Sequence, residues 1–255
     1  MAGDGAAGDV PVRRMTADVV GFWAAAVTAV SAAVALGVAV MTPPRSGSFC
    51  TSDCITPPYT NVARFVPRDY LWMYPACLMV VSFVVLVACV HQSVTESRRV
   101  FSLVGLSFAV IAATAATMDY TVQLAVVQPS LLLGQRDGLS LFSMYNPHGV
   151  VIAFEDLAYL VMGLSFLSVA GALPTVGGVL RATRITFLVA GVLAVVSLVG
   201  LASFFGRDLG YRYEVAAISI DWLALTVSGV LLAIAFRRGA VGDRPGHDGV
   251  GRTPD

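Results

Sequence analysis

Six long apolar segments constrain this chain more than any other feature of its sequence. Each is long enough for a helix to cross the roughly 30 Å hydrocarbon core of a membrane. With 57% hydrophobic and only 13% charged residues, the composition also differs from that of ordinary soluble domains. We therefore expect an all-α integral membrane protein, a six-transmembrane-helix bundle over residues 18–238. The expected spans are 19–41, 70–91, 101–127, 149–173, 185–205 and 215–236. Residues 1–17 and 239–255 are rich in Gly, Ala, Asp and Pro, and we expect both to be disordered tails.

The charged residues exclude two classes of function. The formal net charge is zero, so no basic excess would attract a nucleic acid. All sixteen basic residues are arginine, and a chain without lysine cannot hold retinal or another cofactor as a Schiff base. With the N-terminus placed in the cytoplasm, ten arginines flank the cytoplasmic helix ends and six flank the opposite ends. This bias favours a multi-pass protein of the cell membrane with both termini in the cytoplasm.

Four acidic residues fall inside these spans, where an ionisable side chain is costly and indicates function. Alternate helices run in opposite directions and rise about 1.5 Å per residue, so Asp119, Glu155, Asp156 and Asp221 should all lie about 10 to 15 Å below one membrane face. That face carries the two long loops of the chain. Glu155 and Asp156 are adjacent and point about 100° apart around their helix, so they cannot both face the same point.

These acids have no arginine at their own depth to neutralise them. Each charged acid costs about 2.5 to 3.5 kcal/mol at the centre of a membrane helix, and less near the interface. We therefore expect at least one carboxyl group to keep its proton near neutral pH. A neutral carboxylic acid in an apolar pocket can act as a proton donor.

The tyrosine and tryptophan residues are distributed unevenly between the two halves of the membrane. Of the eleven, only Trp23 belongs to the half opposite the acids, whereas an interfacial belt populates both sides. The pattern favours an aromatic-lined chamber over the alternative, a larger number of anchors at one interface. The ten on the acid side are Tyr59, Tyr70, Trp72, Tyr74, Tyr120, Tyr145, Tyr159, Tyr211, Tyr213 and Trp222. Helical spacing adds Gln123 on the face of Asp119, and places Tyr159 on the face of Glu155.

The remaining motifs narrow the chemistry. The sequence has no DDxxD, Walker, HExxH or GxSxG motif, and its three histidines are too dispersed for a zinc or haem site, so we expect no metal and no cofactor. His148 follows Asn146-Pro147, a typical helix start, and could also relay protons to the acids. Cys50 and Cys54 either form a small disulfide or stay as two thiols in a loop.

Three functions account for an acidic, aromatic chamber within a membrane. In the first, a protonated carboxyl donates its proton to an alkene or epoxide of a lipophilic chain, and aromatic faces stabilise the carbocation. In the second, the carboxyl groups carry protons or cations along a transport path. In the third, the acids only hold helices together by hydrogen bonds in a non-catalytic scaffold subunit.

The separated intramembrane acids Glu155, Asp156 and Asp221, the all-helical membrane build and the missing diphosphate motifs resemble the small integral-membrane terpene cyclases of fungal meroterpenoid and actinobacterial indole-terpenoid pathways. The fungal members are usually drawn with seven helices, whereas this chain has six apolar segments. The resemblance implies an isomerase that protonates and then deprotonates a prenyl chain by means of carboxyl groups. Its partners would be a lipophilic prenylated small molecule and the membrane lipids. The lysine-free, Ala-, Val- and Arg-rich composition suits a high-GC bacterium, where such pathways occur.

On this hypothesis the acids take separate roles. Glu155 or Asp156 donates the first proton, Asp119 with Gln123 supports or relays it, and Asp221 is the base or a second acid. The rings expected to face the cation are those of Tyr120, Tyr159 and Trp222. The other residues expected to bind the substrate are Gln123, Tyr145, His148 and Trp72.

Overall fold

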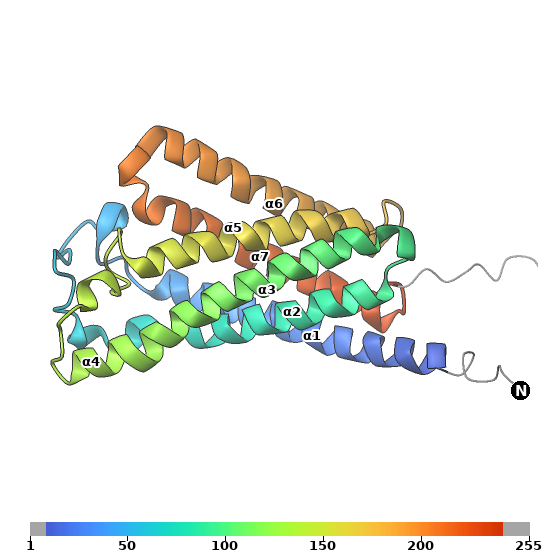
Figure 1. The fold of residues 1–255 in the computed structure, drawn as a ribbon, viewed down its shortest axis with the longest axis horizontal. Helices are drawn as coiled ribbons and strands as arrows, with labels where there is room; N and C mark the ends of the chain where they lie inside the picture. The colour runs from blue at the N-terminus through green and yellow to red at the C-terminus, as the bar shows by residue number, and fades with distance from the viewer. Residues whose placement is uncertain (1–8, 242–255) are drawn as a thin grey trace, which may run out of the picture.

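The structure, a computed structural model, describes residues 9–241 of the chain. Within that range it is all-α, without a β-strand, and its six long apolar helices form a bundle that can span a membrane (Figure 1). The fold class expected from the six apolar segments is thereby confirmed. The long helices are α1 (Asp9–Met41), α2 (Met73–Ser93), α3 (Arg99–Val122), α5 (Val150–Ala172), α6 (Gly178–Phe205) and α7 (Gly210–Arg237).

The two ends of the bundle differ in character. The described chain begins and finishes at the same end, because it crosses the bundle an even number of times (Figure 1). We call this the terminal end. The opposite end, which we call the loop end, is formed by residues 42–72, 133–149 and 206–209 and lies at the left in Figure 1. The short 3₁₀ helices are η1 (Gly47–Phe49), η2 (Ala63–Phe65), η3 (Arg68–Tyr70), η6 (Leu139–Leu141) and η7 (Gly206–Asp208) at the loop end, and η4 (Glu96–Arg98) at the terminal end.

Three helices begin five or more residues earlier than the sequence predicts. Helix α1 starts at Asp9, so residues 9–17, expected in a disordered tail, are helical; Pro11 lies in the first turn, where a missing N–H leaves no helical bond unmade. Helices α6 and α7 start at Gly178 and Gly210, seven and five residues before the expected spans. Their first turns carry charged residues that can extend toward the membrane surface, so each helix outlasts its apolar segment. Residues 1–8 and 242–255 of the expected tails lie outside the described residues.

The chain stays helical beyond the last α-helical residue of α3, Val122. It continues through a π-helical turn, η5 (Gln123–Val127), into the short helix α4 (Gln128–Leu132). The backbone N–H of Gln128 bonds to the carbonyl of Gln123, five residues back, and Pro129 follows immediately. A proline cannot donate its own helical bond, and a wide π turn is one way to keep the chain helical in front of it. The π turn starts one helical turn after Asp119.

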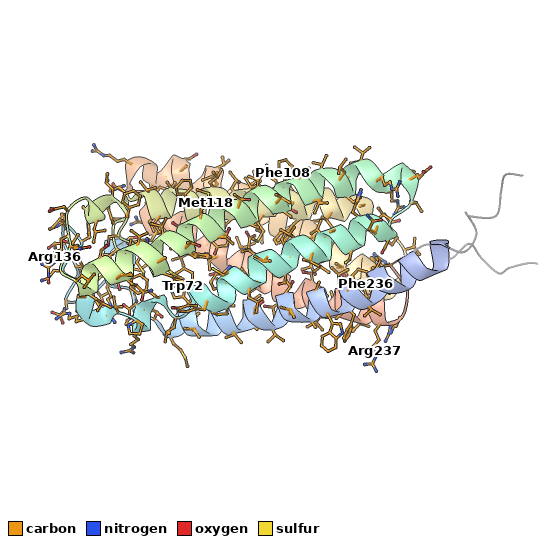
Figure 2. All side chains as sticks on the ribbon, turned by 60° about the horizontal axis from the view of Figure 1, so that its bottom comes forward. Trp72, Phe108, Met118, Arg136, Phe236 and Arg237 are labelled. Carbon is orange, nitrogen blue, oxygen red and sulfur yellow. A yellow bond between two sulfur atoms is a disulfide. The ribbon has the colours of Figure 1, made fainter. Side chains whose placement is uncertain are left out.

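The outer surface of the bundle has the character of a surface that contacts lipid. Large apolar side chains project outward from every long helix; Met118 on α3, for example, is 56% exposed and points away from the bundle (Figure 2). The arginines instead lie toward the two ends, as Arg136 and Arg237 illustrate (Figure 2). In water such an apolar surface would be strongly unfavourable, whereas in a bilayer it is solvated by hydrocarbon. The chain is therefore a multi-pass membrane protein.

The interior of the bundle is filled differently toward its two ends. Helix α1 packs against α2 and α7, α5 packs against α3 and α6, and α7 also contacts α5. Toward the terminal end the centre is occupied by three phenylalanines. Phe166 stacks on Phe187 with centroids 5.0 Å apart, and Phe83 meets the Phe166 ring edge-on at 5.5 Å. The polar residues expected to form a site lie nearer the loop end.

Small residues allow the helices to approach one another closely, as is common in membrane bundles. At Gly229 of α7 an added Cβ would lie 2.8 Å from the backbone oxygen of Ala25 and 3.0 Å from the backbone nitrogen of Ala29 on α1. At Gly37 of α1 an added Cβ would meet no atom within 4 Å. The α1–α7 pair is thus in contact through backbone, which cannot move aside as a side chain can.

The first prediction compares these two glycines. Gly229→Ala should lower the free energy of unfolding by about 1 to 3 kcal/mol, because the methyl group forces α1 and α7 apart. Gly37→Ala, the matched control, should be neutral or slightly stabilising, because it removes glycine from a helix without a clash. Thermal unfolding of the two purified variants in the same detergent measures the difference. Equal midpoints would show that α1 and α7 are not packed this closely.

Candidate functional site

A cavity of about 340 Å³ opens at the loop end, between the last turns of α1 and the first turns of α7. Its volume is within the range of small-molecule sites in proteins. Apolar side chains line most of it, and a few polar groups converge at one side. The lining residues are Leu36, Ala39, Val40, Thr42, Pro43, Pro44, Arg45, Ser46, Phe49, Asp69, Trp72, Met144, Tyr145, Tyr211, Glu214, Val215, Ile218, Ser219 and Trp222.

Two tryptophans form the inner wall of this cavity. The rings of Trp72 and Trp222 are 5.8 Å apart and both line the cavity. Behind them, Tyr120 meets Trp72 edge-on at 5.4 Å, and Tyr159 meets Trp222 edge-on at 6.3 Å. All four residues are among those expected from the sequence to bind a substrate. The two tryptophans line the cavity and the two tyrosines do not; Trp222 is nevertheless as fully buried as the tyrosines.

A pair of glutamates stands at the polar side of the cavity. Glu214 of α7 lines the cavity, and Glu155 of α5 is buried behind it. The two carboxyl groups are within hydrogen-bonding reach of each other. A carboxylate is only an acceptor, so this contact is favourable when one of the two groups holds a proton. Glu155 and Glu214 therefore form a carboxyl pair that can share one proton, as two carboxyl groups do in aspartic proteases.

Two further acids lie close to this pair. Asp119 of α3 is near enough to interact electrostatically with Glu155 and Glu214, and so is Asp156 of α5. Glu155 is buried, whereas Asp156, about 100° around the same helix, is only partly buried. Asp119 Oδ2 and Asp156 Oδ1 are sealed from solvent without a hydrogen-bond partner among the described residues. Carboxyl groups from three helices thus meet in one cluster, with Glu214 as the member that reaches the cavity.

Asp221 is not part of this cluster. It lies about two turns deeper along α7 than Glu214 and is fully buried. Asp221 is close enough to interact electrostatically with the phenols of Tyr159 and Tyr213. Neither of its carboxyl oxygens has a hydrogen-bond partner among the described residues. The structure therefore connects Asp221 to the other expected site residues through Tyr159.

The two tyrosines behind the wall are joined through their hydroxyl groups. Tyr120 on α3 and Tyr159 on α5 share a hydrogen bond, and each is close enough to Glu155 to interact with its charge. Buried hydroxyl groups accept and donate in turn, so this pair can pass a proton between α3 and α5. Gln123, which is expected to support Asp119, contacts the loop that precedes α5. Its amide donates to the carbonyl oxygen of Phe142, 2.6 Å away, and so ties the π turn to the loop that precedes α5.

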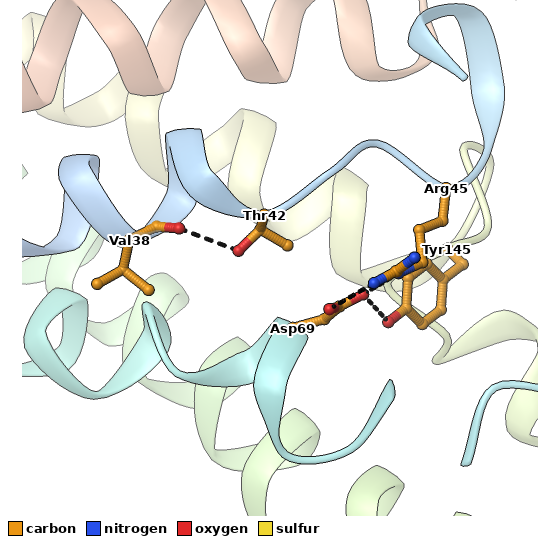
Figure 3. A network of polar contacts seen from close by, with 5 residues as sticks. All are labelled: Val38, Thr42, Arg45, Asp69 and Tyr145. Carbon is orange, nitrogen blue, oxygen red and sulfur yellow. Dashed lines mark hydrogen bonds and ion pairs between the residues drawn. The ribbon is translucent and has the colours of Figure 1, made fainter. Parts of the chain in front are cut away.

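An ion-pair network closes the cavity on the side of the first loop (Figure 3). Arg45 forms a two-point ion pair with the fully buried Asp69, and the hydroxyl of Tyr145 donates to Asp69 Oδ2 over 3.0 Å. The guanidinium also lies over the ring of Phe65, 3.7 Å from its centroid. The hydrogen bond to Asp69 raises the pKa of Arg45, and burial, together with Tyr70 and Asp69, raises the pKa of the Tyr145 phenol. Arg45 thus stays charged and Tyr145 stays a hydrogen-bond donor at any physiological pH.

Residues 42–55, which we call the lid, cover the cavity from the loop end. Ser46 shares a 3.0 Å hydrogen bond with the hydroxyl of Tyr211, which donates to the carbonyl of Met144 over 2.8 Å. The structure joins Cys50 and Cys54 in a disulfide within the lid. The lid is thus fixed to α7 by Ser46 and to η3, just before α2, by Arg45.

The second prediction concerns this disulfide. It closes a loop of only five residues, so replacing Cys50 and Cys54 with Ser should lower stability by no more than about 2 kcal/mol on the chain-entropy account. The lid should nevertheless open more often. Limited tryptic digestion would show this as faster cleavage in the lid, at Arg45, with cleavage at the exposed Arg98–Arg99 turn at the other end as the internal reference. Unchanged relative rates would mean that the disulfide does not restrain the lid.

His148 lies elsewhere. It is exposed and lines a separate depression on the loop end with Asp208 and Arg212, and its backbone N–H donates to Asn146 Oδ1 over 3.0 Å. It does not line the cavity that Glu214 and the tryptophans form. Its position matches the local role at a helix start, since α5 begins two residues later, at Val150.

Sequence reasoning missed two features of this site. The first is Glu214, which lies just outside the sixth expected span because the apolar segment starts at Val215. Its spacing of seven residues from Asp221, which puts both on one helix face, is the signal that could have identified it. The Arg45–Asp69 pair joins two loop positions 24 residues apart, and no periodic signal links them. Among residues 9–241 no group of three or more His, Cys, Asp or Glu side chains is arranged to hold a metal ion.

Comparison with known proteins adds no assignment. No protein-family model, no characterised protein and no solved structure matches this chain. The function is therefore argued from the site itself.

Proposed function

We propose that the cavity catalyses the proton-initiated cyclisation of a prenyl chain. The observation that carries the proposal is the position of the Glu155–Glu214 pair, which can present a proton to a cavity that is otherwise lined by apolar and aromatic side chains. An alkene is a weak base and is protonated only where a strong enough acid meets it without competing water. A carboxyl group in a mostly apolar cavity is suited to that step.

The reaction balances without another reactant. Glu214 adds its proton to a terminal alkene carbon or an epoxide oxygen, a neighbouring double bond closes the ring onto the resulting cation, and loss of a proton from carbon gives a product isomeric with the substrate. The Trp72 and Trp222 faces at the inner wall can stabilise the positive charge during ring closure, because the faces of aromatic rings attract cations. The proton lost from carbon passes to the Glu155–Glu214 carboxylates, which restores the shared proton of the pair for the next turnover.

The interior of the bundle favours an enzyme over a transporter. Phe83, Phe166 and Phe187 are buried and in contact toward the terminal end, and the cavity that Glu214 lines opens at the loop end. A disulfide at the loop end fits an oxidising compartment, and together with the arginine bias it favours a loop end that faces outward from the cytoplasm. The substrate would then reach the cavity from the outer leaflet of the cell membrane.

A deuterium experiment tests the proposal. Protein in lipid nanodiscs is incubated in D₂O with farnesyl and geranylgeranyl derivatives of small alcohols and aromatics, with and without a terminal epoxide. Cyclisation of an alkene substrate gives an isomer that carries one deuteron on carbon, which mass spectrometry detects without knowledge of the ring pattern. Protein in which Glu155 and Glu214 are both replaced by Gln is the control and should give no deuterated isomer. Recovery of every substrate unchanged from active-site-intact protein would count against cyclisation of this class.

A further inference from the structure

We infer that the cavity binds a single-chain amphiphile from the bilayer, with a hydrogen-bond-donating and non-anionic head at Glu214 and a chain that leaves between α1 and α7. The inference rests on the proposed function only in taking this cavity as the substrate site; a prenyl substrate held in this way brings its far double bond to Glu214 when the chain folds back along the cavity. Its test measures binding and not turnover, so the two can fail separately.

The apolar side of the cavity faces the surrounding lipid. Its rim is formed by Leu36 and Val40 at the end of α1 and by Val215 and Ile218 at the start of α7. Val40 is 77% exposed and Val215 is 45% exposed on the outer surface of the bundle. The lining is therefore continuous with the hydrocarbon-facing surface along the α1–α7 seam. A flexible apolar chain can occupy this seam without contacting unpaired backbone groups, because both walls are regular helices whose N–H and C=O groups are already hydrogen-bonded.

Glu214, at the polar side of the cavity, receives no hydrogen bond from a donor group of the described residues other than a protonated carboxyl. Apart from the proton that it can share with Glu155, Glu214 has no hydrogen-bond partner among the described residues; its Oε2 is sealed from solvent, so Oε1 is the oxygen that a head group can reach. Tyr211 bonds to Met144 and Tyr145 bonds to Asp69, and the indole N–H of Trp222, which has no partner among the described residues, is sealed from solvent. A buried acceptor left without a donor is unfavourable by about 1 to 3 kcal/mol. A hydroxyl or amine head group supplies the missing donor.

The charges around the cavity select against an anionic head. Arg45 is the cation among the lining residues, and its charge is neutralised by the two-point ion pair with Asp69. Around Glu214 the neighbouring charged groups are the carboxyl groups of Glu155, Asp156 and Asp119. A phosphate, sulfonate or carboxylate head would meet acids and no free cation, and such repulsion at low dielectric is strong. The recognised class is thus an alcohol or amine amphiphile.

The three tryptophans of the chain provide the assay. Trp72 and Trp222 line the cavity, whereas Trp23 on α1 is 63% exposed to the outside of the bundle near the terminal end. Bromine quenches tryptophan fluorescence only on contact. The Trp23→Phe variant therefore reports bromoalkyl chains in the cavity, and the Trp72→Phe/Trp222→Phe variant reports the same chains in the bilayer. The probes are a long-chain bromoalkanol and a bromoalkanesulfonate of equal length in phosphatidylcholine nanodiscs.

After normalisation to the Trp23 signal, the alkanol should quench the cavity tryptophans at a concentration about tenfold or more below that of the sulfonate, a difference of about 1.4 kcal/mol. Glu214→Gln should reduce this discrimination. Ala39→Phe, which fills the seam, should weaken quenching by the alkanol, whereas Ala33→Phe on the exposed face of α1 should not. Equal quenching by both probes would overturn the head-group assignment. Quenching of Trp23 alone would overturn the binding site itself, whatever the result of the cyclisation assay.

Discussion

Replacing Glu214 with Gln should lower turnover of a prenyl substrate by about 10² to 10⁴-fold, the usual contribution of a general acid. Glutamine keeps the shape of the side chain and its hydrogen-bonding capacity, but it cannot donate a proton to carbon. Glu155→Gln should have an effect of the same order, because Glu214 then loses the carboxyl group with which it shares a proton. The measurement is the initial rate of isomer formation in nanodiscs at saturating substrate.

The control for this pair is Glu96→Gln. Glu96 is an exposed acid in the turn between α2 and α3 at the terminal end, and its replacement removes the same charge from the chain without touching the cavity. Tryptophan quenching by the bromoalkanol confirms in each variant that the cavity still fills. A protein that cyclises its substrate at the full rate in both the Glu155 and the Glu214 variants does not use this carboxyl pair as its acid.

Replacing Arg45 with Met should destabilise the protein by about 3 to 5 kcal/mol, because it leaves the fully buried Asp69 without its counter-charge. Among residues 9–241, the hydroxyl of Tyr145 is the one hydrogen-bond donor that would remain for that carboxylate. Adding Asp69→Asn to the Arg45→Met variant should recover part of the loss, because it removes the uncompensated charge. Arg64→Met is the matched control, since Arg64 is exposed and contacts the same Phe65 ring without an ion pair to Asp69.

Unfolding of these variants is followed by tryptophan fluorescence in detergent against temperature. Identical midpoints for Arg45→Met and Arg64→Met would show that the Arg45–Asp69 pair does not hold the lid to the bundle. A double variant less stable than Arg45→Met would show that Asp69 stabilises the loop end through contacts other than its charge.

The sequence and the structure agree on what depends on hydrophobicity and helical rise. Six apolar segments are enough to identify six spans, and counting residues from the loops is enough to place Asp119, Glu155 and Asp156 at a common level. Which acid reaches the cavity depends on the rotation of each helix, and packing sets that rotation. The backbone contact at Gly229, for example, brings α1 against α7, and the cavity opens farther along the same seam.

The parts that could not be predicted are those made by polar groups at element boundaries. Glu214 lies in the site because α7 begins at Gly210, before its apolar segment, so that Glu214 is already helical and lines the cavity. The lid takes its position from pairings between loops, Arg45 with Asp69 and Ser46 with Tyr211, that have no period and no fixed spacing. His148, which the sequence analysis expects to bind the substrate or relay protons, lies on the outside of the loop end.

The protonation of the glutamate pair is the central claim, and infrared difference spectroscopy measures it directly. Protonated and ionised carboxyl groups absorb at separate frequencies, so a spectrum of the nanodisc protein at neutral pH, compared with those of Glu155→Gln and Glu214→Gln, counts the protons on the pair. We expect a protonated-carboxyl band that shifts on transfer to D₂O and is lost or displaced in each variant. If the spectra of both variants match the wild-type spectrum in that region, the pair shares no proton. The cavity would then have no acid with which to begin a cyclisation.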